Sequence, residues 1–242
     1  MSLKALEDLT TAYAWLYHQK MSLSTIDLYF TMLRHREPKD FPGGKHPPIL
    51  KALGVPDNAL KNPKIDELSL SLRNEAFAFI IAHELGHIRF RHKPLSDITP
   101  EEAQKDETQS DQFALDVLAR TGTPPLGAVL FFQAQIYSLK HRAEFNSDEA
   151  FRKYVTLTMT HPLSIERIKA MTAYIQGPLA RSRPKETAVW QGIAMQLGQI
   201  AAIMEDVELA RCVIKVAKEA DVSILQPRKA VEAAEMMRLC RA

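Results

Sequence analysis

Two histidines four residues apart stand in one apolar segment of this chain, and their spacing constrains the local fold strongly. Residues 83–87 read His-Glu-Leu-Gly-His, and the apolar, proline-free segment around them runs from Asn74 to about His92. In a helix, side chains at positions i and i+4 project from the same face in adjacent turns. We therefore expect a helix capped by Asn74 that presents two imidazoles side by side. Because apolar residues occur nearly all round it, the helix is predicted to be buried and central.

Length and composition are those of a globular protein with one main domain. The 242 residues are 46% hydrophobic, enough for one good core or two modest ones. Lysine and arginine (31) nearly balance aspartate and glutamate (29), and the interspersed charges argue against a nucleic-acid partner. The apolar runs are shorter than the roughly 18–20 residues of a membrane-spanning helix, and the first residues lack the features of a secretory signal. We expect a cytoplasmic protein without a membrane span.

The two cysteines, Cys212 and Cys240, lie far in sequence from the two histidines. A single pair is not typical of a disulfide framework or of a thiolate metal site. We expect both to be reduced and to pack as small apolar side chains.

Helical periodicity dominates most of the chain. Thr99-Pro100-Glu101-Glu102 combines a capping box with proline at the first helical position, which predicts a helix from there to about Arg120. Six prolines from Pro38 to Pro63 predict a long irregular loop with a short turn of helix at residues 49–53. Further helices are expected at residues 3–20, 24–36 (with a strand at 26–30 as the alternative), 126–141, 148–159, 164–175, 186–205, 207–220 and 227–241.

Residues 68–72, Leu-Ser-Leu-Ser-Leu, alternate strictly, which is typical of a half-buried strand. As an edge strand they could bind an extended peptide, although the same residues could instead begin the helix that follows. Gly177-Pro178 marks a possible boundary between a main domain of residues 1–177 and a C-terminal helical extension of residues 178–242. The expected fold class is therefore mainly α, with a small β-sheet or edge strand.

The residues that carry chemistry concentrate on residues 83–87 and on the next helix. Two imidazoles on one helix face can bind one zinc ion, and Glu84 beside them can move a proton from metal-bound water to a leaving group. Gly86 costs about 1 kcal/mol relative to alanine inside a helix, which predicts a close neighbouring helix. Glu107 and Asp111 are four apart on that next helix. One of them can complete a three-ligand set while the other accepts a hydrogen bond from a ligand histidine.

These motifs resemble those of the gluzincin metallopeptidases, most closely the M48 group that includes the CAAX prenyl proteases. The resemblance covers about residues 74–175. It rests on His83-Glu-Leu-Gly-His87, on Glu107-x-x-x-Asp111, and on Thr160-His161-Pro162 with Arg167 downstream.

The resemblance implies a zincin-like fold and a role for each matching residue. His83, His87 and Glu107 would bind Zn²⁺, and Glu84 would be the general base. Asp106, Asp111 or a more distant residue remains an alternative third ligand.

The same resemblance implies supporting roles for three further residues. Asp111 would lie behind His83, and Arg167 would orient nearby carboxylates. His161 would return to the active site, either to stabilise the oxyanion or to cap the metal in a resting state. His92, in the basic run 89–93, is interpreted instead as a favourable charge at a helix C-terminus.

Two departures from the M48 pattern bear on the substrate. This chain has Gln109-Ser110 where many relatives have Glu-Ala before the aspartate, and it lacks the transmembrane helices of the membrane-embedded members. These departures argue against prenylated or membrane-bound substrates.

Two functions are consistent with these residues. The first is a zinc metalloendopeptidase that hydrolyses a peptide or protein substrate with Glu84 as general base. The alternative is a regulatory or partner-binding module on the same scaffold with structural zinc. Glu84 favours the peptidase, because a structural site needs ligands but no base.

Overall fold

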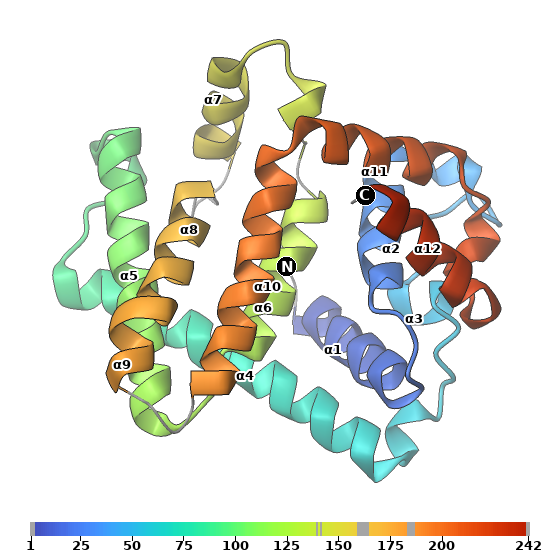
Figure 1. The fold of residues 1–242 in the computed structure, drawn as a ribbon, viewed down its shortest axis with the longest axis horizontal. Helices are drawn as coiled ribbons and strands as arrows, with labels where there is room; N and C mark the ends of the chain where they lie inside the picture. Colours follow the sequence, from blue (N-terminus) through green and yellow to red (C-terminus); the bar gives the residue numbers. More distant parts are fainter. Residues whose placement is uncertain (1–2, 139, 141, 159–164, 183–186, 241–242) are drawn as a thin grey trace. The chain divides into compact units, whose positions relative to one another are not determined.

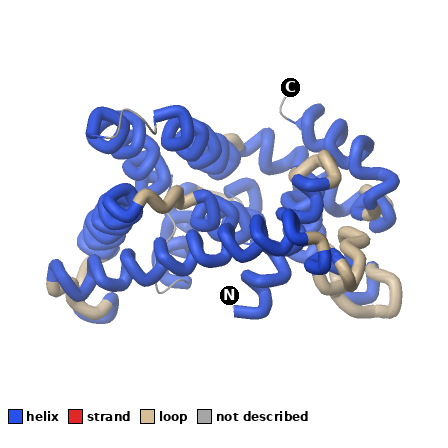
Figure 2. The backbone as a smooth tube through the Cα atoms, turned by 90° about the horizontal axis from the view of Figure 1, so that it is seen from below, coloured by secondary structure: helices blue, strands red, loops and turns tan. Residues whose placement is uncertain are grey.

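The computed structural model describes residues 3–138, 140, 142–158, 165–182 and 187–240, and its regular elements are helical (Figure 1). Figure 2 shows helices and loops but no strand in this part of the chain. The prediction of a mainly α fold is confirmed, and the predicted strand or small sheet is wrong for these residues. The α-helices are α1 (Leu3–His18), α2 (Ser24–His35), α3 (Ile49–Ala52), α4 (Pro63–Phe90), α5 (Pro100–Thr121), α6 (Leu126–Ser138), α7 (Asp148–Thr158), α8 (Ile165–Tyr174), α9 (Ala180–Ser182), α10 (Thr187–Glu205), α11 (Val207–Glu219) and α12 (Ala230–Cys240).

Short helical turns connect several of these helices. A π-helical turn over Ile175–Leu179 follows α8 directly. The 3-10 turns include Pro38–Asp40, Ala59–Lys61, Leu95–Asp97, Arg142–Glu144, Val222–Leu225 and Pro227–Lys229.

Helix α4 begins much earlier than the sequence predicted, and this removes the expected strand at residues 68–72. Its first residue is Pro63, and the Asn62 side chain accepts a hydrogen bond from the backbone N–H of Lys64 at 3.0 Å. The buried positions of this first part recur every three or four residues, so the helical period over a long window outweighs a local alternation. They are Ile65, Ser69, Leu72, Ala76 and Phe79.

Helix α5 has the ends that its sequence predicted. The Thr99 hydroxyl accepts a hydrogen bond from the Glu102 backbone N–H at 3.2 Å, and the Glu102 carboxylate accepts one from the Thr99 N–H at 2.8 Å. At the other end, Gly122 has a φ of 72°, the left-handed conformation that commonly ends a helix. The capping box is confirmed, and it fixes where α5 starts relative to the carboxylates that follow.

The chain divides into two compact units, and each is described by itself. The predicted boundary at residue 178 stays a prediction, and the compact units are divided along the chain at other places. One unit contains residues 1–73, 130–143 and 206–242, and the other contains residues 74–129 and 144–205.

In the first unit, α2 contacts α11 and α12, and these last two helices contact each other. Their contact brings the Cα atoms of Cys212 and Cys240 to 5.5 Å, and the two residues form a disulfide. This separation lies within the usual range for a disulfide, about 4.4–6.8 Å. The prediction of two reduced cysteines is therefore wrong, because it considered sequence distance from the histidines rather than the packing of the two C-terminal helices.

In the second unit, α8 packs against both α10 and α5 (Figure 1). Each of these three helices carries fully buried apolar side chains: Leu115 and Leu118 in α5, Ile168 in α8 and Trp190 in α10. Burying each side chain of this size stabilises the fold by about 1.5–3 kcal/mol. This packing holds α8 in place beside the carboxylates of α5.

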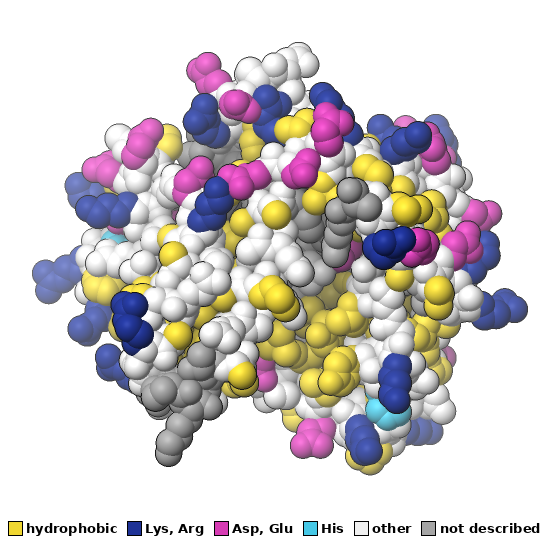
Figure 3. All heavy atoms as spheres, in the orientation of Figure 1, with side chains coloured by type: hydrophobic (Ala, Val, Ile, Leu, Met, Phe, Trp, Pro, Cys, Tyr) yellow, Lys and Arg dark blue, Asp and Glu magenta, His cyan; other side chains and the backbone are white. Residues whose placement is uncertain are grey.

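The surface agrees with the balanced charge of the sequence. On the face drawn in Figure 3, Lys and Arg side chains are intermixed with Asp and Glu side chains. Within the described residues, none of the helices combines the length and apolar character needed to cross a bilayer.

Candidate metal centre

Helices α4 and α5 meet at Gly86. A Cβ atom built on this glycine would lie 3.0 Å from the Ser110 Cα and 3.2 Å from the Ser110 Cβ and Oγ. Such contacts are tighter than ordinary van der Waals contacts, so a larger side chain would push the helices apart. The predicted close approach at Gly86 is confirmed, and it brings the acidic face of α5 against the histidines of α4.

Three side chains converge beside this contact. His83 Nε2 and His87 Nε2 are 3.0 Å apart. The Glu107 carboxylate lies 3.3 Å from His83 Nε2 and 3.4 Å from His87 Nε2. The three residues form a group that could bind a metal ion.

The three side chains differ in how far they are buried. The Glu107 side chain is 2% exposed and that of His83 is 6% exposed, whereas that of His87 is 20% exposed. Polar groups that leave water need partners inside the protein, and charged groups need them most. The group is therefore open to solvent on the side of His87 and closed on the side of His83.

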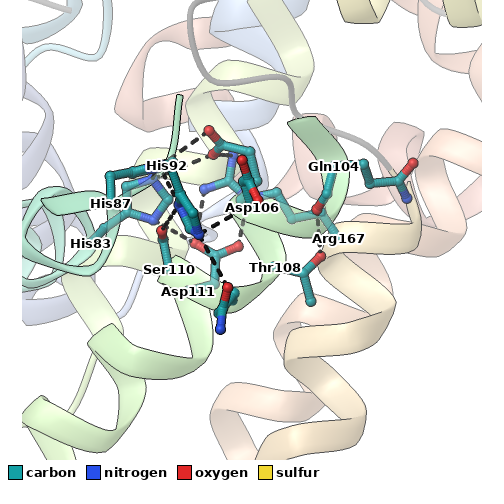
Figure 4. Close-up of polar contacts among 11 residues, drawn as sticks. His83, His87, His92, Gln104, Asp106, Thr108, Ser110, Asp111 and Arg167 are labelled. Carbon is teal, nitrogen blue, oxygen red and sulfur yellow. Dashed lines mark hydrogen bonds and ion pairs between the residues drawn. The ribbon is translucent and has the colours of Figure 1, made fainter. Parts of the chain in front are cut away.

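Behind His83 lies a charged pair. His83 Nδ1 is 2.9 Å from Asp111 Oδ1, and because an ionised carboxylate only accepts, the imidazole donates its Nδ1–H. Arg167, from α8, donates from Nε to Asp111 Oδ2 at 2.5 Å and from a terminal nitrogen to Asp111 Oδ1 at 2.8 Å. Its other terminal nitrogen lies 2.8 Å from Glu107 Oε2. One guanidinium thus holds two buried carboxylates from α5, those of Asp111 and Glu107. Figure 4 shows Arg167 beside Asp111.

These contacts shift the pKa values of the buried groups. Burial lowers the pKa of His83, but hydrogen bonds with Asp111 and Glu107 outweigh it and raise the pKa to about 9. Burial alone would raise the pKa of Asp111, whereas the charge and hydrogen bonds of Arg167 hold it below its usual range. Without a metal, the site therefore holds a proton on His83 near neutral pH.

Helix α4 is not buried all round, contrary to the prediction. Ile81, Leu85 and Ile88 are each at least half exposed, and their spacing of four and three places them on one face. Glu84 is exposed too, next to the buried His83 in sequence. The sequence suggested burial because apolar residues surround the helix, but the face that carries Ile81, Leu85 and Ile88 is exposed.

His92 was not assigned to the site from sequence, yet its ring lies against His87. The two Nδ1 atoms are 3.0 Å apart, and the His92 side chain is only 7% exposed. Figure 4 shows His92 near Asp106 and Ser110 of α5. The interpretation as a helix-end charge stays a prediction, and it did not anticipate this contact with His87. A glycine after the helix would have signalled a chain reversal there, but this chain has Arg91.

The remaining predicted residues fall into two groups. Asp106 lies beside His92, with 3.5 Å between its Oδ1 and His92 Nε2, and Asp111 lies behind His83, so neither belongs to the converging group. His161, with its neighbours Thr160 and Pro162, lies outside the described residues.

The fold and the site geometry thus describe a mainly helical protein with a buried His-His-Glu group that could bind a metal ion. Peptidase U49 is the family whose sequence model matches, over residues 52–186, more than half of the chain. The chain belongs to the peptidase U49 family. The matched range contains all three residues of the candidate metal centre together with Asp111 and Arg167. No match was found among curated proteins or among solved structures.

Proposed function

We propose that this chain is a zinc metalloendopeptidase, with His83, His87 and Glu107 as zinc ligands and Glu84 as the general base. The observation that carries the proposal is the convergence of two Nε2 atoms and one carboxylate, 3.0–3.4 Å from one another, at a buried helix contact. Membership of a peptidase family supports a peptide or protein substrate.

The spacing of these atoms fits zinc. Tetrahedral zinc has bonds of about 2.0–2.2 Å to nitrogen and oxygen, which places neighbouring ligand atoms about 3.3–3.5 Å apart. The Glu107 carboxylate has one oxygen 3.3 Å from His83 Nε2 and the other oxygen 3.4 Å from His87 Nε2, and the two Nε2 atoms are 3.0 Å apart, so modest side-chain shifts would bring three ligand atoms to this spacing. Two histidines and one glutamate also leave a fourth position for water or substrate, as in catalytic zinc sites.

The residues around the ligands have distinct tasks in this mechanism. Bound zinc supplies an acidified water and a polarised scissile carbonyl. Glu84 accepts a proton from the attacking water and delivers it to the leaving amine. Asp111 keeps a proton of His83 on Nδ1, so that Nε2 is the nitrogen that would bind the metal. Arg167 compensates the negative charge of the two buried carboxylates.

The finer assignment follows the order of the motifs along the chain. An M48-like member of the gluzincins is proposed from this order, with a peptidase domain of residues 1–177, a helical extension of residues 178–242 and a cytoplasmic location. His161 is proposed to stabilise the oxyanion or to cap the metal. Residues 68–72 are helical, so they are not proposed to bind substrate as an edge strand.

Glu84→Gln tests the proposal. The variant should bind zinc as the wild type does, because the substitution leaves all three ligands in place, while cleavage of an unfolded protein substrate should fall by roughly 10²- to 10⁴-fold. Zinc content is measured on the purified protein, and cleavage is followed with and without a chelator. Glu101→Gln, at an exposed glutamate of α5, is the matched control and should cleave normally.

Three outcomes would count against the proposal. Wild-type protein that purifies without zinc and does not take it up would exclude the metal centre. Undiminished cleavage by Glu84→Gln would exclude Glu84 as the base. Holo protein that cleaves no substrate would favour the partner-binding module.

A further inference from the structure

The backbone after α4 turns back on itself and returns His92 to the helix. Arg91 has a φ of 57°, the left-handed conformation, although it is not glycine. The Arg91 N–H bonds to the Ile88 carbonyl at 3.2 Å, and the His92 N–H bonds to the His87 carbonyl at 3.1 Å. This pair of bonds is the Schellman arrangement of a helix C-terminus. It sets the His92 ring beside the His87 ring, with centroids 4.9 Å apart.

The neighbours of His92 determine where its proton lies. His92 Nε2 is 3.1 Å from the side-chain oxygen of Gln109 and 3.5 Å from a carboxylate oxygen of Asp106. Both atoms are acceptors, so His92 carries its proton on Nε2. Its Nδ1 is then an acceptor, which also suits the Ser110 hydroxyl at 3.5 Å.

The hydrogen bonds of His92 extend through His87 to the candidate metal centre. Because His92 Nδ1 accepts, His87 donates its own Nδ1–H across the 3.0 Å that separates the two atoms. The lone pair of His87 then lies on Nε2, which faces His83 and Glu107. With the other tautomer, His87 would point an N–H at the position of the metal.

We propose that His92 is a positioning residue that holds His87 in its metal-binding tautomer and orientation, anchored by Gln109 and Asp106. The proposal rests on the proposed function, since it concerns the same zinc ligands. In this role His92 would support His87 as Asp111 supports His83. Partners of this kind behind a metal ligand typically contribute 10- to 100-fold to metal affinity or activity.

His92→Asn and His92→Leu form the matched pair that tests this. The two side chains have similar size and shape, but only asparagine offers an oxygen near the position of His92 Nδ1. We expect His92→Leu to bind zinc roughly 10- to 100-fold more weakly than the wild type, measured by competition with a chromophoric chelator, and His92→Asn to recover most of that loss. Lys93→Ala, at the exposed neighbouring position, should bind zinc normally. Circular dichroism confirms that each variant is folded. Equal zinc affinity in wild type and His92→Leu, or equal losses in both His92 variants, would overturn the proposal.

A second measurement needs no substitution. Two-bond ¹⁵N–¹H correlation spectra of the zinc-loaded wild type should show His87 protonated on Nδ1 and His92 protonated on Nε2 alone. A proton on His92 Nδ1 would overturn the proposal even if the variants fail to fold. Wild-type protein that binds no zinc would instead refute the proposed function itself, so the two failures are distinguishable.

Discussion

The two histidines of α4 lie in different surroundings, although they share one helix face. His83 is closed off from solvent and backed by Asp111, which is in turn held by Arg167. His87 is partly exposed and backed by the ring of His92, which is held from the other side by Gln109 and Asp106. The first side is buried and its first contact is a carboxylate, whereas the second is nearer the solvent and its first contact is an imidazole ring.

The two histidines of one motif are therefore supported by two different kinds of partner. A buried carboxylate strengthens a ligand histidine by charge, but it depends on a compensating arginine that must also be buried. A histidine partner fixes a tautomer without adding charge. We therefore expect the His83 side to dominate fold stability and the His87 side to affect mainly metal binding.

The largest effect should follow from breaking the charged side with Asp111→Ala. This change leaves Arg167 buried without its main partner and His83 without its acceptor. Removing one member of a buried ion pair costs about 3–5 kcal/mol, so the free energy of unfolding in urea should fall by that amount. Asp116→Ala on the same helix is the control, because it removes a hydrogen bond from Tyr174 worth about 1 kcal/mol. An equal effect of the two substitutions would contradict the comparison.

The charged side should also make zinc binding depend on pH. His83 has a pKa of about 9 in the folded, metal-free protein against an ordinary value of 6.5. Zinc needs the neutral imidazole, so apparent zinc affinity should fall about 50-fold between pH 9 and pH 7, and about tenfold for each pH unit well below 9. Isothermal titration calorimetry across this range measures the slope. An affinity independent of pH would contradict the proton on His83.

The raised pKa of His83 also predicts how the stability of the metal-free protein changes with pH. Because the folded-state value is raised, the stabilisation is complete below pH 6.5 and is lost as the pH rises toward 9. Thermal unfolding with and without zinc should therefore diverge as the pH rises, the metal-free form losing stability while the zinc-loaded form gains.

The smallest of these effects should come from the helix contact that both sides share. In Gly86→Ala, the new Cβ would lie 3.0 Å from the Ser110 Cα. Overpacking costs about 1–3 kcal/mol, against a gain of about 1 kcal/mol in helix propensity, so we expect a net loss of up to about 2 kcal/mol and weaker zinc binding. Gly198→Ala in α10 meets nothing within 4 Å and should instead gain about 1 kcal/mol. A gain in both variants would show that the helices can separate freely.

Much of the fold could be predicted because its signals are local. The capping box at Thr99, the apolar periodicity of most helices and the cost of a glycine at position 86 each depend on neighbours within a few residues. The strand predicted at residues 68–72 failed for the same reason, because five alternating residues are too short a window to outweigh a helix that starts at Pro63. The pairing of Cys212 with Cys240 depends on the packing of α11 against α12, which no local pattern records.

Three features of the site could be predicted from the sequence alone. Two imidazoles share a helix face, a glutamate follows the first of them, and two carboxylates share a face of the next helix. These follow from the period of the α-helix, which is a property of the backbone. The helical period does not show which carboxylate meets the imidazoles or which one lies behind His83. Nor does it show that His92 turns back onto His87. These features are seen only in the tertiary structure. Those choices depend on how closely α4 and α5 approach at Gly86 and on the left-handed turn at Arg91, which are matters of packing and chain reversal.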